Sequence, residues 1–144
     1  MANDCGATIA IAGDPKVARD WLASVSEPGP GLIAMESVCF DVDLRSPMSI
    51  LERLDPVPPG IEAEDHWGSQ HPDRETRLMS QRLGCAYVET VFACGPPREA
   101  FDRIAAAFTE LTFTITYSEV GFGETGTVVW TDGCRIVDVR VSLC

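Results

Sequence analysis

Strict alternation between apolar residues and threonines over residues 111–117 constrains the fold more than any other feature of this 144-residue chain. Side chains of an extended strand point alternately to its two sides, so a period of two predicts a strand with one buried face and one open face. The apolar members of the pattern are Leu111, Phe113, Ile115 and Tyr117. A sheet with one side packed on a core is therefore the starting point for the fold.

Strand and helix patterns occur elsewhere in the chain in a regular order. Asp132-Gly133 favours a tight hairpin turn between two further strands. Asp14 and Pro15 are typical of a helix start, and apolar residues then recur at helical spacing as far as Val25. In chain order we expect a strand at 7–12, a helix at 15–25, a strand at about 32–42, a strand at 86–93, a helix around 101–108, and strands at 111–117, 127–130 and 135–141.

Two strand-helix-strand units side by side are typical of one α+β architecture, the ferredoxin-like split β-α-β sandwich. We predict that architecture for a single domain over residues 1–144, with the helices on one face of the sheet. The C-terminal hairpin is expected to extend the sheet. Its free edge leaves open the formation of a homodimer.

Residues 44–84 differ from the rest in composition and are interpreted as an insert. Ser46-Pro47 is expected to begin a short helix that runs to Leu54, where a proline-rich stretch ends it. In the later part, apolar residues at helix-like spacing predict a second short helix over residues 73–83, closed by Gly84.

The charge balance restricts the partners that the chain can bind. There are 22 Asp plus Glu against 11 Lys plus Arg, a net charge of −11, and only one of the bases is a lysine. Nucleic-acid affinity comes largely from cations that neutralise phosphates, so a duplex-binding role is disfavoured. We expect a soluble cytoplasmic protein, because no apolar run is long enough to span a membrane and the start lacks the pattern of a secretory signal. The six cysteines form no close pairs, as expected in a reducing compartment.

Several stretches are similar to the YubB-type ferredoxin-like domain family. They are Asn3-Asp-Cys5 before the first strand, the His66-Trp67-Gly68 segment, the predicted strand that leads to Pro96-Pro97, and the ordered series from Phe108 to Gly133. The resemblance implies the ferredoxin-like fold and an origin in plasmids, phages or other mobile DNA. The family has no established activity, so the resemblance implies none here.

Motifs that suggest chemistry have simpler interpretations in this chain. Gly121-Phe-Gly123-Glu-Thr-Gly126 matches a nucleotide-binding pattern, but a strand follows it instead of the required helix, so we predict a turn. Glu89, Glu119 and Glu124 are interpreted as single polar positions on a half-buried sheet. His66 and His71 match no zinc-ligand spacing and are interpreted as loop histidines. We therefore expect no catalytic residue, no cofactor and no metal.

The predicted function is the binding of another protein. We expect the contact surface in the insert and just before it, and its predicted residues are Asp41, Asp43, Glu62, Glu64, Asp65 and Trp67. The expected partner is a basic protein or complex of a bacterial host, such as a nucleic-acid-targeting restriction or CRISPR complex, whose phosphate-binding groove carboxylates can occupy. This is the role of an anti-defence, DNA-mimic-like inhibitor.

Three alternatives stay open. Trp67 can anchor a partner or can fold back as a plug over the sheet. The open sheet face can bind nucleic acid if Tyr87, Phe92 and Tyr117 supply a stacking platform. An enzyme with an unrecognised carboxylate site is the third alternative.

Overall fold

The computed structural model describes residues 4–25, 49–69, 71–121 and 123–142. These residues form six strands and four helices. In chain order they are β1 (Asp4–Gly13), α1 (Pro15–Val25), α3 (Ile50–Leu54), α4 (Ala63–Trp67), β2 (Arg74–Arg82), β3 (Cys85–Ala93), α5 (Arg98–Ala107), β4 (Leu111–Glu119), β5 (Glu124–Thr131) and β6 (Cys134–Ser142).

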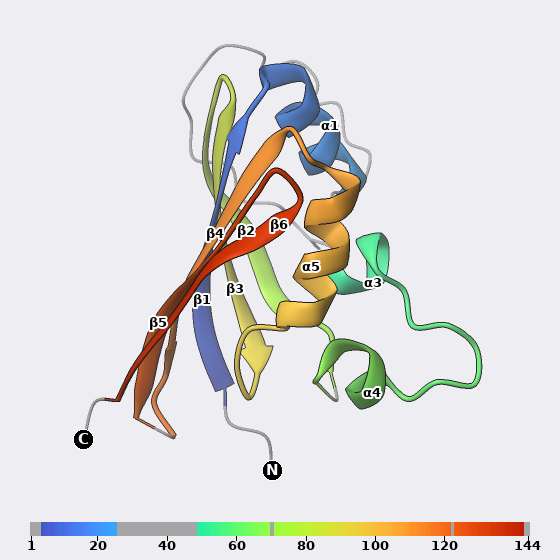
Figure 1. Cartoon of the computed structure of the whole chain (residues 1–144), viewed down its shortest axis with the longest axis vertical. Coiled ribbons are helices and arrows are strands. Elements are labelled where there is room, and N and C mark those ends of the chain that lie inside the picture. The colour runs from blue at the N-terminus through green and yellow to red at the C-terminus, as the bar shows by residue number, and fades with distance from the viewer. Residues whose placement is uncertain (1–3, 26–48, 70, 122, 143–144) are drawn as a thin grey trace.

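The strands form one antiparallel sheet in the order β2-β3-β1-β4-β5-β6. The four strands β2, β3, β1 and β4 have the order of a ferredoxin-like split β-α-β sandwich, in which β1 lies between β3 and β4. The hairpin of β5 and β6 continues the sheet beyond β4 (Figure 1). The predicted α+β class, the ferredoxin-like topology and the added C-terminal hairpin are therefore confirmed.

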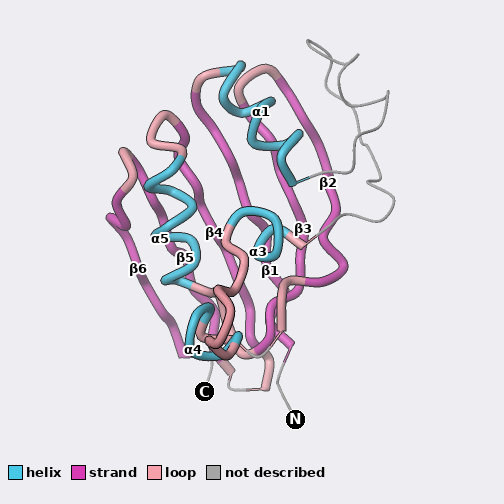
Figure 2. Tube along the Cα trace, turned by 90° about the vertical axis from the view of Figure 1, so that its right-hand side faces the viewer, coloured by secondary structure: helices cyan, strands magenta, loops and turns pink. Residues whose placement is uncertain are grey.

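All four helices cover the same face of the sheet, as the two perpendicular views show (Figures 1 and 2). The core lies between them and the sheet, because alternate residues of the central strands point inward. Its largest fully buried side chains include Trp21 of α1, Phe101 of α5, Phe113 of β4 and Trp130 of β5. The opposite face of the sheet has no helix among the described residues.

The first helix begins as the sequence predicts. The carboxylate of Asp14 accepts hydrogen bonds from the backbone N–H groups of Lys16 and Val17, at 3.0 and 3.2 Å. Pro15 occupies the first helical position, where no N–H is needed.

The sequence-based prediction of a helix over residues 73–83 is wrong, because this segment forms the strand β2. Two irregularities in its pairing with β3 cause the mistake, one between Arg74 and Arg77 and one between Leu78 and Ser80. Glu75 has a φ of 54°, as expected at such a bulge. The buried residues of β2 are Thr76, Leu78 and Gln81. Met79 and Leu83, whose spacing from Leu78 suggested a helix, are 36% and 67% exposed, so they do not form a buried helical face.

The strand that we expect at about 32–42 lies outside the described residues. In the described sheet, β2 lies beside β3, at the place of the second strand of a ferredoxin-like unit. The short helix of the insert ends at Leu54 as predicted. Its N-cap is Ser49 and not the Ser46-Pro47 pair, which lies outside the described residues. The five-residue helix α4 was not predicted.

Candidate protein-binding surface

The insert between α1 and β2 is fastened to the core by Trp67, the last residue of α4. Its side chain is only 4% exposed. Its indole Nε1 donates a hydrogen bond of 2.7 Å to the backbone carbonyl of Asp55, just beyond α3. Trp67 therefore fixes α4 relative to α3 and acts as a plug.

A buried carboxylate gives α4 a second attachment. Asp55 accepts two hydrogen bonds from the guanidinium of Arg103 on α5, at 2.9 and 2.7 Å. The same guanidinium donates to the backbone carbonyl of His66 at 2.7 Å. The bond to Asp55 raises the pKa of Arg103 above its usual value.

His66 completes this attachment. Its Nε2 lies 3.1 Å from an Asp55 carboxylate oxygen, but the angle is not that of a hydrogen bond, so the pair is a close contact only. The C-terminal end of α4 is thus held by the buried side chain of Trp67 and by the hydrogen bonds of Arg103 to Asp55 and to the carbonyl of His66.

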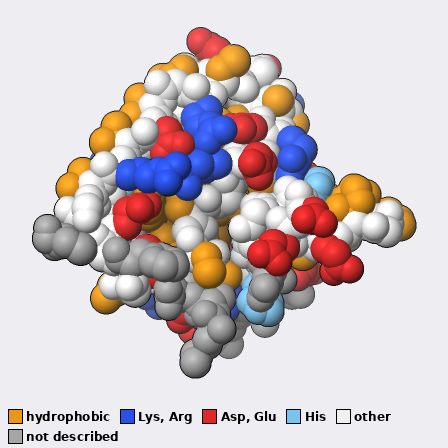
Figure 3. Space-filling model, turned by 60° about the horizontal axis from the view of Figure 1, so that its bottom comes forward, with side chains coloured by type: hydrophobic (Ala, Val, Ile, Leu, Met, Phe, Trp, Pro, Cys, Tyr) orange, Lys and Arg blue, Asp and Glu red, His pale blue; other side chains and the backbone are white. Residues whose placement is uncertain are grey.

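The N-terminal turn of α4 presents three carboxylates to solvent. Glu62 precedes the helix, Glu64 and Asp65 belong to its first turn, and all three are exposed. Acidic side chains gather at the lower right of Figure 3, whereas basic side chains gather to the upper left of its centre. We call Glu62, Glu64 and Asp65 the α4 carboxylates.

The structure brings together only part of the predicted contact surface. Glu62, Glu64 and Asp65 lie on one exposed turn. Trp67 does not belong to the contact surface, because its indole is buried in the core. Asp41 and Asp43 lie outside the described residues.

A network at the other end of α5 has no signal in the sequence. The guanidinium of Arg98 donates to both carboxylate oxygens of Asp138 on β6, at 2.7 and 3.1 Å, and to the hydroxyl of Tyr117 at 3.1 Å. Tyr117 in turn donates to Glu124 at 3.0 Å. These contacts attach α5 to β4, β5 and β6. The four residues are far apart in the sequence, so only the register of the strands shows that their side chains meet.

The pKa shifts of this network follow from its contacts. Burial acts to lower the pKa of Arg98, but its bonds to Asp138 and Tyr117 outweigh burial, and the net shift is upward. The bond from Arg98 lowers the pKa of Asp138. Burial raises the pKa of Tyr117, and its bond to Glu124 adds to the rise.

The three glutamates that we considered as a carboxylate site do not converge. Glu119 and Glu124 lie opposite each other on β4 and β5. Glu89 pairs with Thr8 and points to the open face of the sheet. Gly121 and Gly123 of the glycine pattern lie in a turn, as predicted, whereas Glu124, Thr125 and Gly126 already belong to β5.

The aromatic platform that nucleic-acid binding would require is not formed. Phe92 and Tyr117 are each 2% exposed and point toward the helices. Tyr87, at 46% exposed, is the member of the trio that faces the open side.

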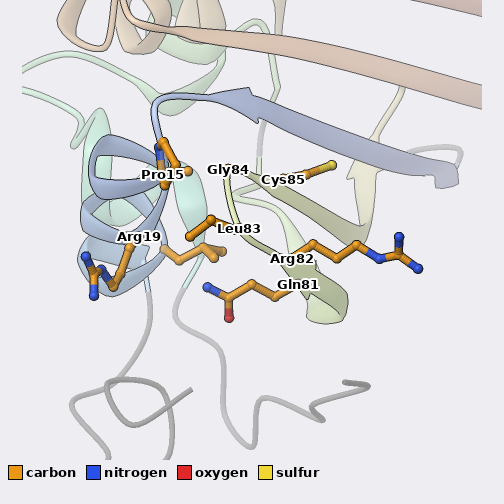
Figure 4. A pocket seen from close by; sticks show the side chains of 9 residues that line it. Pro15, Arg19, Gln81, Arg82, Leu83, Gly84 and Cys85 are labelled. Atoms are coloured by element: carbon orange, nitrogen blue, oxygen red, sulfur yellow. The ribbon is translucent and has the colours of Figure 1, made fainter. Parts of the chain in front are cut away.

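A small cavity lies among the described residues. A cavity of about 20 Å³ lies between α1 and the turn that joins β2 to β3, and is lined by Pro15, Arg19, Gln81 and Cys85 among others (Figure 4). That volume holds about one water molecule. In the same part of the chain, no three His, Cys, Asp or Glu side chains are grouped to hold a metal ion. None of the described helices is long and apolar enough to cross a membrane.

The topology and the helix layer define a ferredoxin-like α+β protein with a C-terminal hairpin. No family model matches the sequence, and no curated protein matches it. The chain is similar in structure to the protein api92 from Yersinia pseudotuberculosis, whose crystal structure is assigned to the family model DUF1281. The two agree with a TM-score of 0.67 at 9% sequence identity, over 99% of each chain. At this identity the likeness shows a shared fold.

Proposed function

We propose that this chain is a non-enzymatic protein-binding module that holds a basic partner on the α4 carboxylates. The observation that carries the proposal is the rigid attachment of α4. Contacts with Asp55 and Arg103 hold the C-terminal end of the helix, so the exposed carboxylates of its N-terminal turn are held in place before a partner arrives. Preorganised groups lose less conformational entropy on binding, which favours affinity.

The charge of the whole chain supports the same partner chemistry. A net charge of −11 attracts basic polypeptides over a distance of about 10 Å at 0.1 M salt. It repels phosphodiesters, which makes nucleic acid an unfavourable ligand.

The finer proposal concerns the partner and the setting. We propose that the partner is a basic, nucleic-acid-targeting defence complex of a bacterial host, and that the protein acts in the cytoplasm as its inhibitor. The resemblance to the YubB-type family supports an origin in mobile DNA. The matching segments occupy defined structural positions, with Trp67 at the end of α4 and Pro96-Pro97 just before α5.

Charge reversal at α4 tests the proposal. The variant carries Glu62→Lys, Glu64→Lys and Asp65→Lys, and the probe is a fluorescent arginine-rich peptide. Each exposed ion pair contributes about 0.2–1 kcal/mol, so the loss of three should weaken binding by about 10-fold. Fluorescence anisotropy measures the affinity.

The matched control reverses three exposed acids elsewhere, Asp20, Glu52 and Glu110, and so changes the net charge by the same amount. If the control weakens binding as much as the α4 variant, general acidity and not α4 attracts the peptide, and the proposal fails.

The finer proposal needs a separate assay. Purified wild-type protein should inhibit DNA cleavage by a restriction or CRISPR complex that it captures from a host lysate. Inhibition should disappear with the α4 variant and persist with the control. Capture that leaves cleavage unchanged contradicts the role of an inhibitor.

A further inference from the structure

The open face of the sheet carries a large area without any charged side chain. Side chains that pair across β1, β4, β5 and β6 form four rows, with four positions from each strand. The positions are alternate residues of 6–12, 112–118 and 125–131, together with Cys134, Val137, Val139 and Val141. We call this area the neutral face.

The composition of the neutral face contrasts with the rest of the chain. All of its positions are occupied by uncharged residues, although 23% of the chain is charged. These residues are glycine, alanine, serine, threonine, valine and cysteine. On the same side of the sheet, charged residues lie at the border with β2 and β3. There Arg74 contacts Asp4, and Arg77 contacts Glu89.

Exposed apolar surface is concentrated on this face. Of the nine large hydrophobic side chains exposed among the described residues, four belong to β6. Three of them lie on the neutral face, with Val137 37%, Val139 52% and Val141 51% exposed. Val129 of β5 pairs with Val137 and continues the apolar strip inward.

The hydroxyl groups of the face are partly satisfied already. Thr112 and Thr131 share a hydrogen bond of 3.1 Å, and Thr125 donates to the backbone carbonyl of Tyr117 at 2.8 Å. Removing these hydroxyls from water costs less than removing free ones. The neutral face is therefore suited to burial against another apolar or weakly polar surface.

The chemistry of the face selects its occupant. A basic protein requires carboxylates and nucleic acid requires cations, and the neutral face has neither. A membrane surface favours large apolar and basic side chains, and valine is the largest residue here. An identical neutral face is complementary, because it lets two chains of charge −11 meet where no carboxylate opposes another.

The area is also appropriate for two copies. Four rows along four strands span roughly 20 by 27 Å, or roughly 500 Å² for each copy. Two copies then bury about 1,000 Å², which is the lower limit of area for a specific interface. Sheets that pack face to face lie about 10 Å apart, a distance that side chains of this size fill.

We propose that a second copy of the chain docks on the neutral face, so that two sheets pack face to face around a two-fold axis. The inference does not depend on the proposed partner of α4. The dimer and the complex with a basic partner should respond to salt in opposite directions. Salt screens the repulsion between two negative chains and strengthens the dimer, whereas it weakens attraction to a basic partner.

The test is sedimentation velocity over a range of protein concentrations. The wild-type chain should approach twice its mass of 15.6 kDa, at lower concentration in about 0.5 M salt than in about 0.05 M salt. Val139→Glu, near the centre of β6, and Thr116→Glu, on β4, each place a carboxylate in the interface. Because the buried charges have no partner, each substitution should raise the dissociation constant at least about 100-fold.

Val120→Glu is the matched control, because Val120 is 82% exposed and lies in the turn after β4, outside the neutral face. It should leave the dimer unchanged. Circular dichroism checks that each variant is folded. If either Val139→Glu or Thr116→Glu does not fold, the other variant still tests the interface.

Three results would overturn the inference. One is a wild-type chain that stays monomeric at high concentration in either salt. Another is a dimer that survives Thr116→Glu, because pairing through the edge of β6 is insensitive to a substitution two strands away. The third is equal weakening by Val120→Glu.

Discussion

Burial determines the chemistry of Cys5, whose side chain on β1 has no exposed surface. Burial raises the pKa of its thiol to about 12, and the nearby charge of Glu119 adds to the rise. We expect thiol reagents to label exposed Cys94 in the folded protein and to label Cys5 only after unfolding. Peptide mapping of the labelled cysteines measures this, and labelling of Cys5 at the rate of Cys94 would contradict it.

The same thiol makes stability depend on pH in alkaline solution. In the unfolded chain the thiol loses its proton near pH 9.0, whereas in the folded chain it keeps the proton until about pH 12. The unfolded state is therefore favoured as the pH rises through this interval, and the free energy of unfolding should fall. Denaturation in urea at several pH values should show a smaller decline for Cys5→Ala.

Trp67 shows what the sequence could and could not reveal at the scale of a residue. An indole beside acidic residues suggested either an anchor or a plug. The choice depends on the carbonyl of Asp55, which lies 12 residues earlier in the chain, and on Arg103 across the core. No local pattern contains these contacts, so the sequence could not decide between the two roles.

We expect Trp67→Ala to lower the free energy of unfolding by about 3–5 kcal/mol, as for other large core residues. Trp67→Phe keeps most of the apolar contact but loses the bond to Asp55, and should cost less. Urea denaturation measures both. Unchanged stability in Trp67→Ala would mean that the indole is not a plug.

At the scale of elements, α3 depends on a residue far away in sequence. Asp73, 4% exposed, accepts hydrogen bonds of 2.9 Å from the backbone N–H groups of Ile50 and Leu51. The hydroxyls of Ser49 and Thr76 also donate to it. A carboxylate just before β2 thus satisfies the start of a helix in the insert.

Asp73→Ala leaves these donors without an acceptor in the core and should destabilise the fold by about 2–4 kcal/mol. Asp20→Ala, an exposed position on α1, is the control and should change stability by less than about 0.5 kcal/mol. Thermal denaturation compares the two, and equal effects would show that Asp73 does not cap α3.

Regular elements were predictable and irregular ones were not. The alternation in β3 and β4 predicted those strands, because each has one buried face. The turn residues Asp132-Gly133 predicted the hairpin of β5 and β6. The bulged β2 lacks a regular alternation, because its pairing with β3 shifts register twice, and its sequence pattern wrongly predicts a helix. A five-residue helix such as α4 is too short to produce a periodic pattern.

At the scale of the whole molecule, the two sides of the sheet have different chemistry. The helix side carries the exposed α4 carboxylates, and the open side carries the neutral face. The sequence could predict the first feature, because acidic residues cluster in one segment. It could not predict the second, because the neutral face exists only once the register of four strands is known.

The central claim is that the acidic surface at α4 selects cationic protein and excludes nucleic acid. The most direct measurement titrates the wild-type protein into a labelled arginine-rich peptide and, separately, into a labelled single-stranded oligonucleotide, at low and high salt. The account predicts binding of the peptide that weakens with salt and is reduced by charge reversal of Glu62, Glu64 and Asp65, with no binding of the oligonucleotide. Tight binding of the oligonucleotide that this charge reversal leaves unchanged would contradict it.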